Sequence, residues 1–244
     1  MSANNPMEQF AIRTLKPLSV SGYDVSFTNS SLWMLVALGV IAVFMVLGTM
    51  KPQLVPGRWQ AALEYVYDFV AGVVNENIGP KGKAYVPLIF SVFVFVLVCN
   101  LLGLVPWVGS FTPTSHIAVT LALALIVFAI VVLVGLINHG LHFFTFFWPK
   151  GMAWPLALFI MPIEVVSFLV RPFTLAIRLF ANMTAGHVLL KVFGTFVVSL
   201  GVFGFIPLGV NVALSALELL IALIQAYVFA LLASIYLNDA INLH

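Results

Sequence analysis

The side chains most able to do chemistry lie in two long apolar stretches of the C-terminal third. Glu164, Arg171 and Arg178 follow one another at intervals of seven residues, so a helix would present them on one face. His187 lies nine residues after Arg178 and falls on the opposite side. Histidine and glutamate accept and release protons, whereas arginine, with a pKa above about 12, keeps its proton. These residue types indicate proton transfer beside a fixed positive charge.

A second polar set lies on the stretch that follows. Glu218 and Gln225 on this second stretch are also seven residues apart and share one face. On the first stretch, Asn182 lies one turn beyond Arg178 and on the same face as that arginine. In an antiparallel hairpin, residues whose numbers have the same sum lie opposite each other. Three polar pairs have nearly the same sum, with a midpoint near residue 202: Glu164 with Asp239, Arg178 with Gln225, and His187 with Glu218. The register therefore predicts polar contacts at three depths of one hairpin.

Ionisable residues within apolar stretches also have a purely structural explanation. Internal salt bridges, or long side chains that reach the membrane interface, would account for Arg171 and Lys191. Arg178 fits this explanation less well, because its neighbours from Leu175 to Ala181 are apolar and no acid lies beside it on its own helix. Its counter-charge is expected on another chain.

The composition places these residues in a membrane. Of 244 residues, 63% are hydrophobic and 7% are charged, against about 25% charged residues in a soluble domain. The mean hydropathy is +1.16. Soluble enzymes and disordered chains are excluded, and 10 basic residues give no electrostatic footprint for a nucleic acid. The single cysteine, Cys99, excludes a disulfide framework.

The expected fold class is an all-α integral membrane protein, with one membrane domain over residues 1–244. A polar tail over 1–30 precedes a spanning helix over 31–50. Polar residues at every fourth position over 57–78 predict an amphipathic helix lying in the membrane interface. A hairpin of spanning helices follows over 84–106 and 114–137. Two long, strongly tilted helices over 153–200 and 208–238 form the last antiparallel hairpin.

Lysine and arginine in the connecting segments predict the orientation. The two loops expected on one side carry five of them: Lys51, Arg58, Lys81, Lys83 and Lys150. The N-terminal tail carries Arg13 and Lys16. Positive loops face the cytoplasm, so the N-terminus is expected outside and the C-terminus inside.

The run from Arg171 to His187, RPFTLAIRLFANMTAGH, resembles the signature of subunit a of the F-type ATP synthase. The segment from Asn100 to Pro106, and Glu218 with Gln225 and Tyr227, support the resemblance, which covers the chain from Pro6 onward. The likeness is to α-proteobacterial and mitochondrial members, because they also have histidine and glutamate at positions 187 and 218, which other members exchange. A further departure is Gly103, where some members carry an acid.

The resemblance implies a non-catalytic stator subunit that couples proton flow to rotation and ATP synthesis. Arg178 would face the carboxylate of a ring of c subunits and prevent protons from crossing directly. His187 and Glu218 would line the outer half-channel. The remaining expected roles are orientation of Arg178 and its water by Asn182 and Gln225, and an inner half-channel with Glu164 and Asp239.

The resemblance also implies the surroundings of the chain. Its partners would be the c ring, b-type peripheral stalk subunits, the rest of the complex, the lipid bilayer and protons. No cofactor, metal or nucleic acid is expected. The location would be the bacterial plasma (inner) membrane, with the mitochondrial inner membrane as the alternative.

Two other classes of protein remain as alternatives. A haem-binding membrane subunit would use His116, His139, His142 or His187 as ligands. His139 and His142 lie near an expected helix end, where an interfacial histidine is the simpler explanation. An autonomous secondary transporter would have more helices, with broken segments in matching halves.

Overall fold

The fold of the chain is seen in a computed structural model that describes residues 10–17, 19–20, 23–24, 26–50, 52–105, 111–140, 143 and 154–242. Within these residues, five helices are long and apolar enough to cross a membrane. They are α1 (Asn29–Thr49), α3 (Val86–Leu104, preceded by the 3-10 helix η2, Pro80–Tyr85), α4 (Ile117–His139), α5 (Trp154–Ser199) and α6 (Phe205–Ile241). The expected all-α membrane fold is confirmed. Helices are favoured because lipid offers no partner to an unpaired backbone group.

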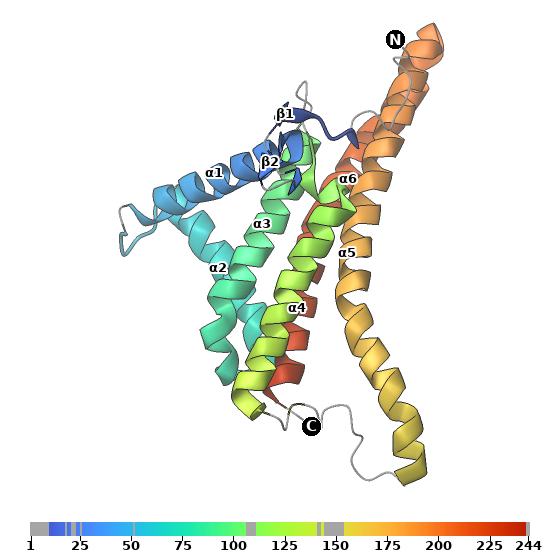
Figure 1. Ribbon diagram of the computed structural model, residues 1–244. Coiled ribbons are helices and arrows are strands. Elements are labelled where there is room, and N and C mark those ends of the chain that lie inside the picture. The colour runs from blue at the N-terminus through green and yellow to red at the C-terminus, as the bar shows by residue number, and fades with distance from the viewer. Residues whose placement is uncertain are drawn as a thin grey trace.

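The last two helices are much longer than the membrane is thick. With 46 and 37 residues, α5 and α6 extend about 69 and 56 Å at 1.5 Å per residue. A hydrocarbon core of about 30 Å therefore requires both to tilt. They run antiparallel and side by side, past the shorter α3 and α4 (Figure 1). Pro162 and Pro172 lie inside α5, where each removes one backbone hydrogen bond and favours bending.

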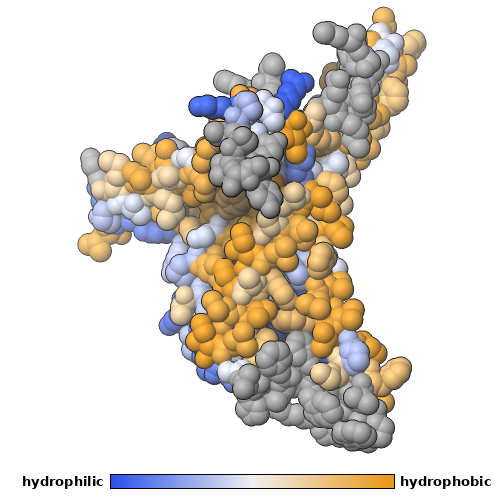
Figure 2. Space-filling view, viewed as in Figure 1, coloured by the Kyte–Doolittle hydropathy of each residue, from blue (hydrophilic) through white to orange (hydrophobic). Residues whose placement is uncertain are grey.

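The surface of the molecule is that of a membrane protein. Large apolar side chains are exposed along α1, α4, α5 and α6. Figure 2 shows them covering one face of the molecule, while hydrophilic residues gather near the N-terminal strands and along α2 (Arg58–Ile78). Lipid, rather than water, is the environment that such a surface requires.

The helix α2 (Arg58–Ile78) is amphipathic, as its sequence indicates. Glu64, Asp68 and Glu76 are exposed, and the opposite side buries an apolar set: Leu63, Val70, Val73, Val74 and Ile78. This apolar side packs on neighbouring helices α1, α3 and α6. The sequence predicted the two sides of α2 but not the protein contacts that cover its apolar side.

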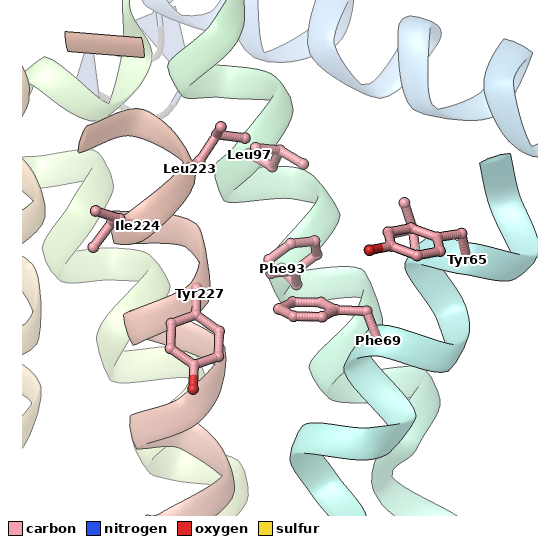
Figure 3. A pocket seen from close by; sticks show the side chains of 8 residues that line it. Tyr65, Phe69, Phe93, Leu97, Leu223, Ile224 and Tyr227 are labelled. Carbon is pink, nitrogen blue, oxygen red and sulfur yellow. The ribbon is translucent and has the colours of Figure 1, made fainter. Parts of the chain in front are cut away.

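Aromatic rings hold α2 against the core. The Phe69 ring lies 5.8 Å from the Phe93 ring of α3 and 5.8 Å from the Tyr227 ring of α6, measured between centroids. Beside them is an apolar pocket of about 370 Å³, which Tyr65 and Leu97 also line (Figure 3). The rings therefore join three helices without filling the space between them.

The N-terminal tail contains short strands that the sequence did not predict. β1 (Thr14–Lys16) pairs antiparallel with β4 (Phe27–Thr28), and β2 (Ser19–Val20) with β3 (Tyr23–Asp24). Strands of two or three residues are too short to show a period-two pattern. The β1–β4 pair leads directly into α1, whose N-cap Thr28 accepts a hydrogen bond from Ser31 N through its hydroxyl.

The hairpin of α5 and α6 turns within the 3-10 helix η5 (Gly201–Gly204). Gly201 has a φ of +55°, a conformation that other residues rarely adopt. A Cβ at Gly204 would overlap the backbone carbonyl oxygen of Val197. The turn is therefore closed tightly by two glycines, whereas Gly209 already lies inside α6.

We expect Gly204→Ala to destabilise the hairpin, because its methyl group would meet the backbone at Val197, which cannot rotate away as a side chain can. The measurement is the fraction of protein that stays unaggregated when detergent-solubilised membranes are heated. Gly209→Ala is the matched control, since nothing lies within 4 Å of its Cβ position and alanine favours a helix by about 0.5–1 kcal/mol. Equal thermal stability of the two variants would contradict the tight turn.

Candidate proton-transfer site

His187 of α5 and Glu218 of α6 meet between the two long helices. The imidazole Nδ1 is in hydrogen-bonding contact with the Glu218 Oε1, as the register of the hairpin predicts. The side chains are 11% and 2% exposed, so the pair is almost dry. Because an ionised carboxylate only accepts hydrogen bonds, a contact with the ionised form requires the ring to donate from Nδ1. The contact joins two groups that both exchange protons.

Gly186, which has no side chain, leaves room for this pair. A Cβ built at Gly186 would lie 2.6 Å from Glu218 Oε1 and 3.1 Å from Glu218 Cγ. Any side chain at position 186 would therefore push the glutamate away from His187. Gly186 allows α6 to place a carboxylate directly against the backbone of α5.

The imidazole has further neighbours outside the hairpin. The hydroxyl oxygen of Thr112 lies 2.5 Å from His187 Nε2. The Phe10 ring lies nearly parallel to the imidazole, with 6.4 Å between centroids. Sequence reasoning missed both residues, because they lie outside the periodic helices. The signal that could have found Thr112 is the polar run Thr112, Thr114, Ser115 between two apolar helices.

This polar run forms a buried hydrogen-bond network. It is the 3-10 helix η3 (Pro113–Ser115) with the residue that precedes it. Thr114 donates to Asn100 Oδ1 (2.8 Å), and Asn100 donates to the carbonyl oxygen of Ala222 (3.2 Å). Thr184 donates to the carbonyl oxygen of Ser115 (3.3 Å). The network fixes the segment from Thr112 to Ser115 against both long helices.

Two buried oxygens near the pair have no hydrogen-bond partner among the described residues. They are Glu218 Oε2 and Asn211 Oδ1, which are two helical turns apart on α6. A buried polar atom without a partner costs about 1–3 kcal/mol. Glu218 Oε2 can therefore accept a hydrogen bond in addition to the one that Oε1 shares with His187.

Arg171 and Asp239 form an ion pair towards the other end of the hairpin. Arg171 Nη1 donates to Asp239 Oδ2 at 2.7 Å. The guanidinium also lies over the Phe168 ring and the Tyr236 ring, at 5.4 and 5.0 Å from their centroids. Internal salt bridging, the structural explanation considered for Arg171, is therefore observed.

This ion pair replaces one of the expected contacts. Glu164 makes no hydrogen bond or ion pair with a described residue, and Asp239 pairs with Arg171 instead. Arg171 lies seven residues closer to the turn than Glu164. A register set at the turn need not persist along helices of this length, and Pro172, which lies between the turn and Glu164, favours bending of α5 there. The predicted contact between Glu164 and Asp239 is wrong.

Arg178 is exposed and makes no ion pair or hydrogen bond with any described residue. It lies close enough to Tyr236 to act on it electrostatically, as Arg171 does. Asn182 and Gln225 are half-buried, and neither makes a hydrogen bond to Arg178. Within the described chain the third expected contact, Arg178 with Gln225, is not formed.

The histidines considered as haem ligands have other surroundings. His139 Nε2 lies 3.0 Å from the carbonyl oxygen of Ile241. His116, just before α4, stacks on Phe111 at 4.8 Å, and burial lowers the pKa of its imidazole. Among the described residues no three metal-ligating side chains come together. His142 lies outside the described residues.

The long apolar helices define a multi-pass α-helical membrane protein, and its interior holds a buried histidine–glutamate pair of residue types that can exchange protons. A family model described as ATP synthase A chain matches residues 31–238. The chain therefore belongs to the family of ATP synthase subunit a, the non-catalytic proton-channel stator of that complex.

Curated relatives agree with this family along nearly the whole chain. ATP synthase subunit a of Paramagnetospirillum magneticum is 50% identical, over 98% of this chain and 99% of the relative. That of Rhodospirillum rubrum is 50% identical, over 99% and 100%. That of Sphingopyxis alaskensis is 51% identical, over 98% and 97%. The haem-binding and autonomous-transporter alternatives are thereby set aside.

The closeness of Gly186 to Glu218 predicts a specific crosslink. Cysteines introduced by Gly186→Cys and Glu218→Cys, in a Cys99→Ser background, should form a disulfide on mild oxidation. The Cβ at 186 would lie 3.1 Å from the position of Glu218 Cγ, which the cysteine sulfur would take. Non-reducing gel mobility after proteolysis between the two sites measures the bond. The control is Arg178→Cys with Glu218→Cys; if that pair linked more readily, the observed hairpin register would be wrong.

Proposed function

We propose that Arg178 faces the carboxylate of a c-subunit ring and separates two proton half-channels. The observation that carries this proposal is an exposed guanidinium on a membrane-embedded helix, without an ion pair to a described residue. A charge at this depth needs a partner. A carboxylate on a neighbouring chain would supply it, and Arg178 would keep that carboxylate ionised as it passes.

The outer half-channel is the side of His187 and Glu218. This role is supported by the contact between the two side chains, by the hydrogen-bond network beside them, and by Glu218 Oε2, which makes no hydrogen bond to a described residue. A proton arriving at this pair can be held by either group, since each has a neutral and a charged form. Passage onward to the ring carboxylate would then need further polar groups or water, because His187 lies nine residues from Arg178, about 13 Å along α5.

The inner half-channel would involve Glu164 and Asp239. Arg171 holds the Asp239 carboxylate in place, while Glu164 is half-buried and has no hydrogen-bond partner in the described chain. Asn182 and Gln225 would orient Arg178 and its water once the ring is present. In this arrangement Arg178 lies between the two routes and cannot itself pass a proton.

Separation of the two routes matters energetically. Each elementary charge that crosses without rotation loses about 2.3 kcal/mol per 100 mV of membrane potential. A group that always keeps its proton is the simplest barrier to such a leak. Rotation of the ring, and through it ATP synthesis in the soluble part of the complex, then becomes the favoured route for protons.

We further propose a bacterial inner-membrane location, with the N-terminus outside and the C-terminus in the cytoplasm. Lys81 Nζ donates to Asn242 Oδ1 at 3.4 Å, so the positively charged η2 segment lies beside the C-terminal end of α6. The positive-inside rule places both in the cytoplasm. In this arrangement α2 would lie towards the interface, and b-type peripheral stalk subunits would contact the stator.

Arg178→Gln should abolish proton-driven ATP synthesis in inverted membrane vesicles, because glutamine removes the fixed charge while preserving much of the polarity. Arg178→Lys should also fail, since lysine lacks the planar fork and can lose its proton when desolvated. Arg13→Gln, which removes a positive charge outside the spanning helices, is the control and should retain synthesis. Near-normal synthesis in Arg178→Gln would refute the proposed role.

The second test exchanges the residue types of His187 and Glu218. His187→Glu and Glu218→His should each strongly lower proton-driven synthesis, because each leaves two like groups facing each other. The double variant restores one imidazole and one carboxylate at the same contact and should recover part of the activity. A double variant no better than the worse single variant would show that the two residues do not act as a unit.

A further inference from the structure

Thr112 contacts the His187–Glu218 pair through its hydroxyl group. Its hydroxyl oxygen lies 2.5 Å from His187 Nε2, while the other ring nitrogen contacts Glu218. Both nitrogens of the imidazole are therefore bound, from two different elements of the chain. An imidazole held at both nitrogens has a fixed plane, and its tautomer depends on both partners.

A hydroxyl is suited to this position in both protonation states of the ring. When His187 is neutral and donates from Nδ1 to Glu218, Nε2 is an acceptor and the Thr112 O–H donates to it. When the ring is protonated, Nε2–H donates and the hydroxyl oxygen accepts. The Thr112 hydroxyl can rotate between the two arrangements without breaking the contact. An apolar side chain of the same shape could serve neither state.

The backbone around Thr112 is fixed, so the hydroxyl cannot easily move away. Thr112 is 3% exposed. Its carbonyl oxygen accepts hydrogen bonds from the Ser115 hydroxyl (2.6 Å) and the Ser115 backbone N–H (3.0 Å). The neighbouring Thr114 is tied to α3 through Asn100. The loop thus holds Thr112 at one distance from α5.

Gly103 of α3 provides the space that the Thr112 side chain fills. A Cβ at position 103 would overlap the Thr112 hydroxyl oxygen and would lie 2.7 Å from Cγ2 and 2.8 Å from Cβ. Every atom of the Thr112 side chain is therefore too close for a side chain at 103. The contact between Thr112 and His187 depends on residue 103 being glycine.

We propose that Thr112 is a positioning residue of this site: its hydroxyl, admitted by Gly103, holds His187 Nε2 and so presents Nδ1 to Glu218 in both protonation states. This inference rests on the proposed proton-transfer role of His187 and Glu218. It adds a third group and a third helix, α3, to a site that the sequence confined to the last hairpin.

The test compares side chains of one size with and without the hydroxyl, in the complete ATP synthase. Thr112→Ser keeps the hydroxyl and Thr112→Ala removes it, while both lose the methyl group. We expect Thr112→Ser to retain most proton-driven synthesis and Thr112→Ala to lose roughly 3- to 10-fold, the factor that one net hydrogen bond represents. Thr112→Val, which keeps the volume, should fall as Thr112→Ala does.

Two controls separate positioning from folding. Thr195→Val removes a hydroxyl that bonds only a carbonyl of its own helix, Val192 O, and should leave synthesis unchanged. The amount of subunit a that co-purifies with the complex should be equal in Thr112→Ser and Thr112→Ala. Gly103→Ala should lower synthesis at least as much as Thr112→Ala does, because its methyl group would displace the whole Thr112 side chain from His187.

Equal activity of Thr112→Ser and Thr112→Ala would overturn this inference, whether both are normal or both are low. Glu218→Gln, measured alongside, distinguishes this failure from a failure of the proposed function. If Glu218→Gln abolishes synthesis while Thr112→Ala does not lower it, the pair acts without Thr112. If Glu218→Gln also leaves synthesis intact, the proposed proton-transfer role is itself wrong.

Discussion

An ionisable group in the hydrocarbon core is stable only beside a partner, and this constraint organises the two long helices. His187 and Glu218 meet near the turn of the hairpin, and Arg171 and Asp239 meet towards its open end. Each pair joins α5 to α6. Arg178 is the exception, because it lies between these two levels and has no ion-pair partner within the described chain. That imbalance is the basis for the proposal that Arg178 faces a neighbouring subunit.

Glycines at three close contacts make the packing around these pairs possible. Gly186 lets the Glu218 carboxylate approach α5, Gly103 lets Thr112 approach His187, and Gly204 lets the turn close on Val197. Each close approach brings a polar group or a backbone segment to a place that any larger residue would block. Small residues at helix contacts are a general device of membrane proteins, where close packing replaces the hydrophobic effect between helices. Here they also determine which side chains reach the imidazole.

Much of the architecture could be predicted from the sequence, for a definite reason. In lipid, backbone groups must be paired within the segment, so an apolar run of sufficient length is a helix. The runs ending at Thr49 and Leu104 therefore have only one accessible form. The contact between His187 and Glu218 was also predictable, because both residues lie nearer the turn than Arg171 and Asp239 do, so the register predicted from the turn still holds there.

The tertiary structure decided what periodicity does not encode. Asp239 pairs with Arg171 rather than with Glu164, which is separated from the turn by Pro172, a residue that favours a bend in the helix. The tertiary structure buried the apolar side of α2 against α3 and α6. It also brought Thr112 to His187 from a loop 75 residues away in the chain. The sequence by itself determined the helices, their polar residues and one contact near the turn, since these depend on local spacing; the remaining partners depend on helix bends and on the packing of distant segments.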